Sequence, residues 1–271
     1  MRAIKDNCKE LIRSQLRASG FEIVRRPASN GASMPLLRLL IERVISSRGE
    51  GAILQIGAND GVFDDPVHEI IVSLNLPAIL VEPLPDLFEQ LRRNYEHTPR
   101  THFENVAIGA QPGGANIFRV SPGTPGLPQW LQGVASFDKA VLINQRRRSD
   151  VRGVDIERFI ETIPVSVITI GQLLERHPDI GPIIALQVDT EGHDFVVVKS
   201  ALDAGCRPNI ICYEHKHLSY NDAVACRELL STEGYSFCSV GQDTIAYREA
   251  DAPSETVTMG RGMISASVQN G

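Results

Sequence analysis

Along most of the chain, short apolar runs alternate with longer segments in which apolar residues recur at helical spacing. The apolar runs predict strands at 52–56, 78–82, 102–108, 165–168, 183–188 and 209–213, and a hairpin of strands 235–240 and 244–248. The other segments predict helices at 3–19, 35–47, 65–74, 85–95, 169–177, 193–203 and 220–233. Strands that alternate with helices predict an α/β fold with a mostly parallel sheet and right-handed crossovers.

Residues 110–164 interrupt this alternation. Prolines and glycines crowd positions 111–128, and no clear core strand follows before about residue 164. Because long irregular segments in compact domains are usually functional or disordered, we interpret 110–164 as a substrate-facing insertion. Trp130 fits the core better than a sugar platform. The run at 146–148, three arginines, fits a solvated surface better than a binding site for a phosphate or carboxylate on the substrate.

The predicted organisation is a helical extension at 1–50, a main domain at 51–250 and a polar tail at 251–271. The amphipathic helix at 3–19 suits internal packing, with a partner helix or a membrane-surface helix as the alternatives, and it makes a homodimer possible. A net charge of −6 over 271 residues does not suggest nucleic-acid binding. No apolar run approaches the ~20 residues of a membrane helix, and no signal-peptide core is evident. Five scattered cysteines without C-x-x-C spacing favour a reducing, cytoplasmic location.

The stretch Ile53-Leu54-Gln55-Ile56-Gly57-Ala58-Asn59-Asp60-Gly61 is the centre of the predicted site. It consists of a buried strand followed by two glycines four positions apart, and Asp64-Asp65-Pro66 then supplies helix-start chemistry. Glycine lets the backbone approach a ligand, and a helix start offers free N–H groups. A tight turn between strand and helix, without a ligand, explains the same pattern.

A second strand ends in Glu82, 25 positions after Gly57. A carboxylate at a strand end about 20 residues from the glycine turn is suited to accept hydrogen bonds from both hydroxyls of a ribose. No arginine stands beside Glu82 to bind a 2′-phosphate. The spacing G-x-x-x-G differs from the G-x-G-x-x-G of dinucleotide binders, so the pattern favours S-adenosylmethionine over NAD.

The chain resembles the FkbM family of S-adenosylmethionine-dependent methyltransferases. The resemblance is carried by Q-I-G-A-N-D-G at 55–61, V-E-P-L-P-D-L-F at 81–88, N-V-A-I-G at 105–109, A-S-F at 135–137, V-D-T-E-G-H-D at 188–194, Y-E-H-K-H-L at 213–218 and E-G-Y…D-T-I-A at 233–246. It implies the class I methyltransferase fold, a Rossmann-like sheet of seven strands whose last strand is antiparallel. Residues 51–250 would then be the methyltransferase domain.

The resemblance also implies a set of cofactor-binding residues: Gln55, Gly57, Ala58, Asn59 and Gly61 near the methionine part, Glu82 near the ribose, Asn105 and Ala107 near the adenine, and Pro83 as a further contact. Gln55 is a departure, because many class I enzymes have an acid at this position. Its amide can still accept a hydrogen bond from the amino group of the cofactor, but without charge.

Catalytic candidates follow two later strands. Ligands in open α/β sheets lie at the carboxyl ends of strands, which places Asp189 and His215 near Gly57 and Glu82. A hydroxyl is a poor nucleophile, so a nearby base assists its methylation, and histidine exchanges protons near neutral pH. Helix capping by Asp189 and a structural role for His215 are the alternatives. A divalent metal held by Asp189, Glu214 and His215 is a further one.

The sequence therefore predicts an O-methyltransferase that acts on a hydroxyl of a sugar, glycan or secondary metabolite. Two alternatives stay open: an NAD-linked sugar oxidoreductase, and an inactive methyltransferase-like module that binds a partner through its N-terminal helices. The acceptor is a small molecule or glycan that the sequence does not identify, because fold does not fix substrate.

Overall fold

The computed structural model describes residues 33–151 and 153–248. Its main sheet has seven strands in the order β10-β11-β9-β8-β1-β2-β3. They are β1 (Ala52–Ile56), β2 (Ala78–Val81), β3 (Thr101–Glu104), β8 (Ile183–Val188), β9 (Ile210–Glu214), β10 (Tyr235–Val240) and β11 (Asp243–Arg248). β11 is antiparallel to both of its neighbours, and the other pairs are parallel. The predicted class I methyltransferase sheet, with its antiparallel last strand, is confirmed.

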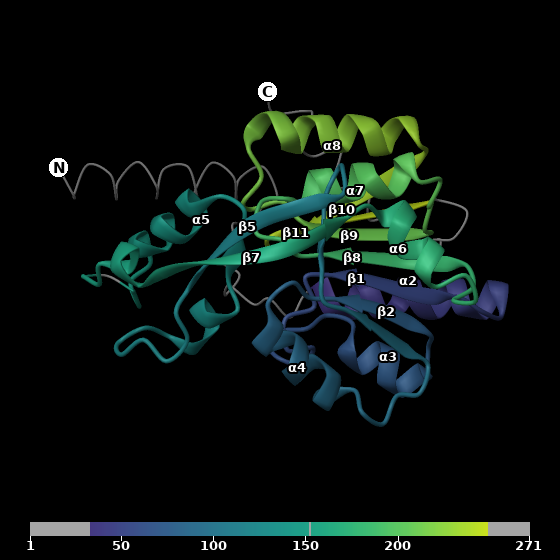
Figure 1. Cartoon of the computed structure of the whole chain (residues 1–271). Coiled ribbons are helices and arrows are strands. Elements are labelled where there is room, and N and C mark those ends of the chain that lie inside the picture. Colours follow the sequence, from purple (N-terminus) through teal and green to yellow (C-terminus); the bar gives the residue numbers. More distant parts are fainter. Residues whose placement is uncertain (1–32, 152, 249–271) are drawn as a thin grey trace, which may run out of the picture.

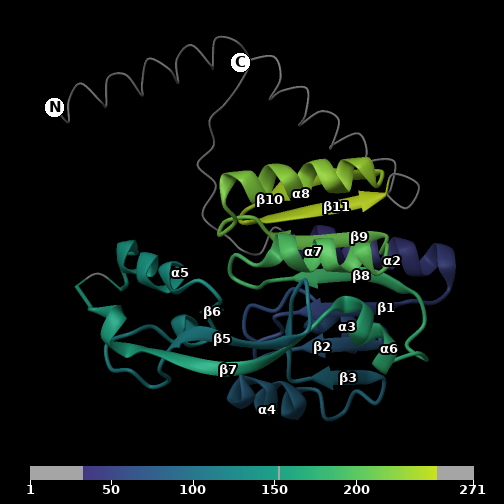
Figure 2. The same cartoon turned by 45° about the horizontal axis from the view of Figure 1, so that its top comes forward.

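Helices cover both faces of this sheet (Figures 1 and 2). α2 (Ser33–Arg48), α3 (His68–Leu74) and α4 (Pro85–Asn94) pack on one face, and α6 (Ile170–Arg176), α7 (Asp194–Asp203) and α8 (Tyr220–Thr232) pack on the other. Side chains alternate along a strand, so Leu54 and Ile56 join one apolar cluster and Ile53 joins the other. Burial on both faces explains why the central strands are continuous apolar runs in the sequence.

α2 is a layer of the main domain, which differs from the helical extension predicted for residues 1–50. Its residues Leu37, Leu40, Ile41 and Val44 are buried in the same cluster as Ile53 of β1. They recur every three or four positions, which is the period of one helix face. The helix predicted at 3–19 and the tail at 251–271 lie outside the described residues.

A second sheet stands at the carboxyl edge of the main sheet (Figure 2). Its four strands follow the order β4-β7-β5-β6. They are β4 (Ala107–Ile108), β5 (Gly113–Val120), β6 (Ala135–Ser136) and β7 (Ile160–Ile168), accompanied by α5 (Lys139–Asn144) and the short helices η2 (Gln129–Gln132), η3 (Gln145–Arg147) and η4 (Ile156–Phe159). This unit has a small apolar core of its own, which includes Val120, Leu131, Leu142, Val151 and Ile156.

Two predictions about this region were wrong. Residues 110–164 contain ordered strands, and the strand predicted at 102–108 is two strands in different sheets, β3 and β4. Asn105 forms the corner between them, because its side-chain amide donates to the carbonyl oxygens of Glu82 at 2.8 Å and Pro83 at 3.1 Å. β7 begins before the predicted residue 165 and includes Pro164. β4 pairs with β7 only at 167–168. Among the described residues, no strand therefore pairs with the β4 side of β7 at Pro164, so a proline is tolerated there.

Arg119 on β5 connects the second sheet to the main domain. Its Nη1 donates to Asp86 Oδ1 on α4 at 2.6 Å, and its Nε donates to Glu161 Oε1 on β7 at 2.6 Å. The Arg119 side chain is 10% exposed, whereas the two carboxylates are 44% and 34% exposed. The pairing therefore holds a largely buried cation between two acids that water still reaches.

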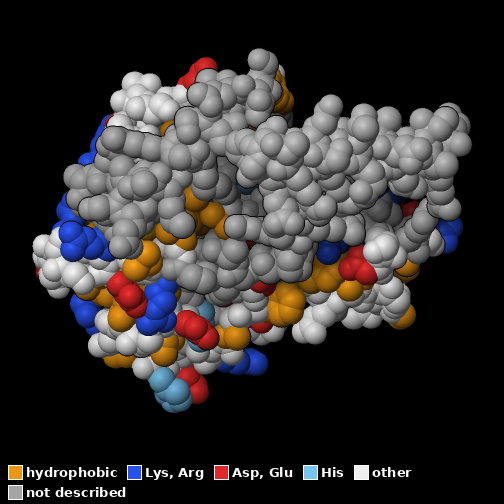
Figure 3. Space-filling model, turned by 180° about the vertical axis from the view of Figure 1, so that it is seen from behind, with side chains coloured by type: hydrophobic (Ala, Val, Ile, Leu, Met, Phe, Trp, Pro, Cys, Tyr) orange, Lys and Arg blue, Asp and Glu red, His pale blue; other side chains and the backbone are white. Residues whose placement is uncertain are grey.

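The surface opposite to the view of Figure 1 carries charges of both signs. On the described part of that face, basic and acidic side chains are interspersed (Figure 3). Among the described helices, none combines the length and the apolar character needed to cross a bilayer.

Candidate functional site

A cavity of about 410 Å³ opens where the carboxyl ends of β1, β2, β8 and β9 meet the second sheet. The main sheet contributes the strand ends and the loops that follow them. The second sheet contributes Ile117, Trp130, Phe137 and Arg148 from the opposite side. Residues of the predicted insertion therefore form one wall of the cavity, and its substrate-facing role stays a prediction.

The turn after β1 forms the floor of this cavity. Gly57 has φ +81°, and a Cβ there would lie 1.8 Å from the carbonyl oxygen of Asp189. Only glycine fits, because both the left-handed backbone and the close approach exclude a side chain. The N–H groups of Gly57 and Ala58 both donate to the carbonyl oxygen of Val81 at 3.0 Å. The turn is thus fixed against β2 on one side and the loop after β8 on the other.

Glu82 is the buried acid at the end of β2 and is 5% exposed. Its Oε2 accepts the N–H of Asn59 at 2.9 Å, and its Oε1 accepts the N–H of Leu84 at 2.8 Å. Burial raises the pKa of Glu82 to about 7, while these two backbone hydrogen bonds act in the opposite direction. The two backbone hydrogen bonds hold the carboxylate rigidly. Each oxygen keeps a lone pair, which leaves acceptor capacity for a ligand in the cavity.

Two glutamines form a pair of unsatisfied acceptors beside the turn. Gln55 of β1 and Gln187 of β8 are directly paired residues of adjacent strands, and both line the cavity. The Nε2 of Gln55 donates to Asp65 Oδ2 at 2.9 Å, which orients its amide. The Oε1 atoms of both glutamines are buried without a hydrogen-bond partner in the described structure. Buried acceptors of this kind are usually satisfied, so they indicate a missing donor.

The helix start predicted at Asp64-Asp65-Pro66 lies slightly later. α3 begins at His68, and Asp65 Oδ1 accepts the N–H groups of Val67 at 2.7 Å and His68 at 2.8 Å. Burial raises the pKa of Asp65. The N-cap residue is Val67, so the predicted acidic cap followed by proline at the first helical position was wrong, although Asp65 still accepts two N–H groups at the helix start and also supports Gln55 at the cavity.

Most predicted cofactor residues come together, but three predicted site residues lie outside the cavity lining. Gln55, Gly57, Ala58, Asn59, Glu82, Pro83, Ala107 and Asp189 line it. Gly61 packs under α4, where a Cβ would lie 2.4 Å from Leu91. Asn105 supports the backbone at Glu82 and Pro83 instead. His215 Nδ1 lies 3.1 Å from Thr244 Oγ1.

Acidic residues concentrate at the ends of β8 and β9. Although the Asp189 side chain is open to the cavity, the protein around it and then the charges of Glu191 and Glu214 raise its pKa. Burial, followed by the charge of Glu191, raises the pKa of Glu214 to about 8. Burial also raises the pKa of Glu191 to about 7. This end of the cavity therefore favours proton uptake or a cation.

His217 lies beside these acids, with its Nε2 3.2 Å from Glu191 Oε2. Burial, followed by the charge of Lys216, lowers the pKa of His217 to about 4. The metal set predicted from the sequence, Asp189 with Glu214 and His215, is not the group that the structure brings together. The described residues that converge are Glu191, Glu214 and His217.

The wall contributed by the second sheet is aromatic and basic. The guanidinium of Arg148 lies 4.1 Å from the centre of the Trp130 ring, and Trp130 Nε1 donates to Asp150 Oδ2 at 2.9 Å. Of the three consecutive arginines, Arg148 lines the cavity. Trp130 also lines the cavity while packing against the small core of the second sheet, which agrees with the core interpretation, and its role as a sugar platform stays a prediction.

Several cavity residues were missed from the sequence. They are Phe63, Phe137, Gln145, Gln187, Glu191, Lys216 and Asp243. Gln187 was the one that a pattern could have revealed. β1 and β8 are both apolar runs with a single glutamine one residue before the last, Leu54-Gln55-Ile56 and Leu186-Gln187-Val188. A lone polar residue in a doubly buried strand needs a partner, and parallel neighbours at the same depth bring two of them together.

One family of known proteins matches more than half of the chain. The methyltransferase FkbM domain matches residues 55–237 of this chain. A solved structure of methyltransferase FkbM from Methylobacillus flagellatus KT has 14% identity and a TM-score of 0.44, covering 73% of this chain and 43% of that chain. A putative caffeoyl-CoA O-methyltransferase from Staphylococcus aureus has 12% identity and a TM-score of 0.41, covering 88% and 91%. An O-methyltransferase from Bacillus cereus in complex with SAH has 13% identity and a TM-score of 0.41, covering 88% and 90%. No curated protein matches the chain.

Proposed function

Because the chain belongs to the methyltransferase FkbM domain family, we propose that it methylates a hydroxyl of a sugar, glycan or other metabolite. Membership of this family makes the chain an S-adenosylmethionine-dependent methyltransferase. It leaves no support for the NAD-linked oxidoreductase considered from the sequence. We propose in addition that the methyl group is transferred to an oxygen and that the acceptor is a sugar, glycan or other metabolite.

The cavity's acceptors carry the assignment of the cofactor site. Glu82 offers a rigid carboxylate suited to two ribose hydroxyls. The free Oε1 atoms of Gln55 and Gln187 suit the donors of an amino group. S-adenosylmethionine has both features, separated by its methionine chain, so the residues present fit this cofactor. The neutral Gln55 that departs from the usual acid is compensated by a second amide oxygen rather than by charge.

When bound, S-adenosylmethionine supplies an electrophilic methyl group on a positively charged sulfur. The chain's own contribution is to hold the acceptor in line and to accept a proton. Asp189 is the candidate base, because its carboxylate is open to the cavity and its backbone borders the glycine turn at Gly57. Its carboxylate oxygen would accept the proton of the acceptor hydroxyl. His215 lies outside the cavity lining, so we assign it a structural role.

The opposite wall supports a sugar-like acceptor. Trp130 and Phe137 present aromatic surface to the cavity, which suits the apolar face of a sugar ring. Arg148 and Lys216 add two cations that also line it and suit an acceptor with hydroxyl or anionic groups. A mixed wall of this kind is typical of sites that orient a polar small molecule.

Calorimetric titration with S-adenosylhomocysteine, the demethylated product of the cofactor, tests the cofactor site. We expect saturable binding by the full chain and clearly weaker binding by Glu82→Ala. The matched control is Glu104→Gln, a glutamate at the end of the neighbouring strand β3 that pairs with Arg176 and His177 outside the cavity. Absence of saturable binding by a folded wild-type sample would refute the proposal. Mass spectrometry for a +14 Da product then identifies the acceptor.

A further inference from the structure

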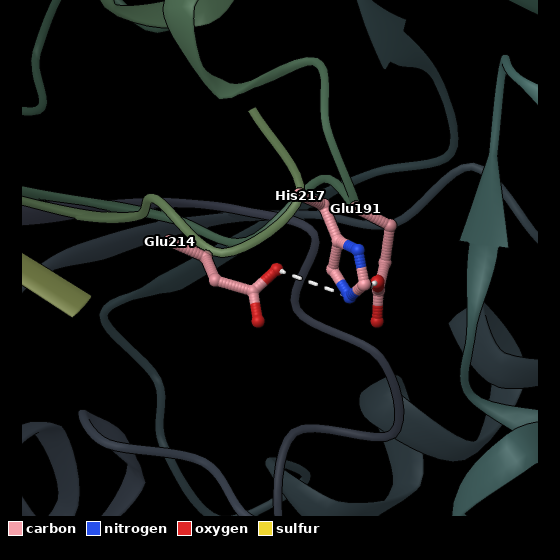
Figure 4. A group of neighbouring side chains, drawn as sticks. All are labelled: Glu191, Glu214 and His217. Atoms are coloured by element: carbon pink, nitrogen blue, oxygen red, sulfur yellow. Dashed lines mark ion pairs between the residues drawn. The ribbon is translucent and has the colours of Figure 1, made fainter. Parts of the chain in front are cut away.

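Three side chains with metal-ligating atoms meet beside the cavity, one of them buried and two half-buried (Figure 4). Glu191 follows β8, Glu214 ends β9, and His217 lies in the loop after β9. One atom from each lies within 4.8 Å of the others. Figure 4 shows that the three side chains lie next to one another, carried by the end of β9 and by the loops after β8 and β9.

None of the three converging atoms has a hydrogen-bond partner. Glu191 Oε2, Glu214 Oε2 and His217 Nε2 are all buried and unsatisfied in the described structure. Glu214 itself is 8% exposed. Their nearest polar neighbours are one another, because His217 Nε2 lies at ion-pair distance from both carboxylates, and such a buried cluster is costly without further hydrogen bonds. A single cation at that location would satisfy all three.

The separations suit one small ion. His217 Nε2 lies 3.2 Å from Glu191 Oε2 and 4.0 Å from Glu214 Oε2. A metal with bonds of about 2.0–2.2 Å holds neighbouring ligand atoms about 3.0 to 4.3 Å apart. Both separations that involve His217 fall inside this range, and all three atoms lie within 4.8 Å of one another, so binding would draw the two carboxylates towards the ion.

The backbone that carries these ligands is fixed by Asp194, which is fully buried at 0% exposure. Its Oδ2 accepts from Thr190 Oγ1 at 3.0 Å and from the N–H of Gly192 at 3.4 Å, on either side of Glu191. Its Oδ1 accepts the N–H of Glu214 at 3.1 Å. Asp194 therefore ties together the loop of one ligand and the strand end of another, which is the support that metal sites commonly have.

We propose that Glu191, Glu214 and His217 bind a divalent transition-metal ion, with Mn²⁺ and Zn²⁺ as the best matches. The donor set combines one imidazole nitrogen with two carboxylate oxygens, a mixture that suits these ions better than the all-oxygen preference of Mg²⁺ and Ca²⁺. Two carboxylates and a neutral imidazole also balance the charge of the ion. Three protein ligands leave coordination positions for water or substrate.

A position at the cavity wall gives the ion a function. Glu191 and Glu214 both line the cavity, as does Asp189. An ion there would coordinate the oxygen of a hydroxyl acceptor and lower its pKa, and Asp189 would take the proton. This role rests on the proposed function, whereas metal binding itself does not depend on it.

Calorimetric titration of the chelator-treated full chain with Mn²⁺, Zn²⁺ and Mg²⁺ separately, without any methyl donor, tests the site. We expect one Mn²⁺ or Zn²⁺ per chain, weaker binding of Mg²⁺, and at least a roughly tenfold loss of affinity in Glu214→Gln and in His217→Ala. Glu104→Gln is again the matched control. Glu104 also lies beside a histidine, His177, but both of its carboxylate oxygens have hydrogen-bond partners. This variant should bind the metal as the wild type does.

Circular dichroism establishes that each variant is folded, and Glu191→Gln provides a third variant if one of the others unfolds. Absence of saturable metal binding by the folded wild type would overturn the proposal, and the three atoms would then share a proton or an ion pair. Metal binding that the folded ligand variants leave unchanged would overturn it as well. Titration with S-adenosylhomocysteine is independent, so failure of the metal site and failure of the methyltransferase proposal are distinguishable.

Discussion

The pH dependence of cofactor affinity tests the role of Glu82 most directly. Its two oxygens already accept the N–H groups of Asn59 and Leu84, so only the remaining lone pairs can accept from ribose hydroxyls. Protonation places a hydrogen on one oxygen and removes acceptor capacity there. Burial raises the pKa of Glu82 to about 7, with the nearby charge of Asp86 adding to the rise and that of Arg119 opposing it. Affinity should therefore increase as the pH rises through neutrality.

The size of the effect follows from the ionised fraction. With a pKa of about 7, roughly one tenth of Glu82 is ionised at pH 6 and roughly nine tenths at pH 8. If only the carboxylate binds both hydroxyls, the Kd for S-adenosylhomocysteine should fall about tenfold over this interval, or about 1.4 kcal/mol.

Titration calorimetry at pH 6, 7 and 8 measures this change, with Glu82→Gln as the comparison. Glutamine keeps the shape and one acceptor oxygen but does not titrate. The Glu82→Gln variant should therefore bind S-adenosylhomocysteine more weakly, and its Kd should lack the pH dependence that Glu82 causes. Any titration of the ligand itself affects both proteins equally, and the ratio of their Kd values isolates Glu82. A ratio that stays constant from pH 6 to pH 8 would refute the assignment of Glu82 as a ribose acceptor with a raised pKa.

The same shift has a consequence for stability. A folded-state pKa of about 7 lies above the ordinary value of 4.5, so the folded protein holds this proton more tightly than the unfolded chain. The contribution of Glu82 to the free energy of unfolding is therefore most favourable below pH 4.5. It declines as the pH rises towards 7, by no more than about 3 kcal/mol. Bound cofactor offsets this cost, which ties stability to occupancy of the site.

Three other substitutions test the remaining inferences. Gly57→Ala should lower the free energy of unfolding in urea by at least about 2 kcal/mol, because the φ of Gly57 and the 1.8 Å approach both exclude a Cβ. The control Gly113→Ala, with open space around the residue, should change the free energy of unfolding by less than about 0.5 kcal/mol. An equal loss of stability in both variants would contradict the argument. Arg119→Ala should cost about 2 kcal/mol in the same measurement, less than a fully buried pair, because its two carboxylates remain accessible to water. Asp189→Asn should lower kcat for transfer of labelled methyl groups about 10²-fold or more with little change in cofactor Kd, whereas His215→Ala should leave both nearly unchanged; the reverse order would return the base assignment to the histidine.

The parts of the fold that are encoded locally were predictable from the sequence. The two-sided burial of the main strands gives continuous apolar runs, and the helices repeat at their own period. The turn at Gly57 and the acid at Glu82 are each adjacent to a strand end, so their shared edge followed from the rule for parallel sheets. The second sheet was missed because β5 is largely exposed along its first half and β7 contains Pro164. Such strands lack the apolar signal of a doubly buried strand.

At the end of β9, His215 was predicted to face the site, but Glu214 lines the cavity instead. The alternation of side chains along a strand explains this difference. The N–H of His215 still donates to the carbonyl oxygen of Gln242, so the strand pairing extends one residue past Glu214 before a turn begins at Lys216. Successive side chains of an extended segment point to opposite sides. Glu214 and Lys216 line the cavity, and His215 between them is directed to Thr244. Applied to the sequence, alternation would have excluded His215 as soon as Glu214 was placed in the site. The convergence of His217 with Glu191 depends on two loops and on a left-handed residue, Glu191 with φ +51°, which no local pattern encodes.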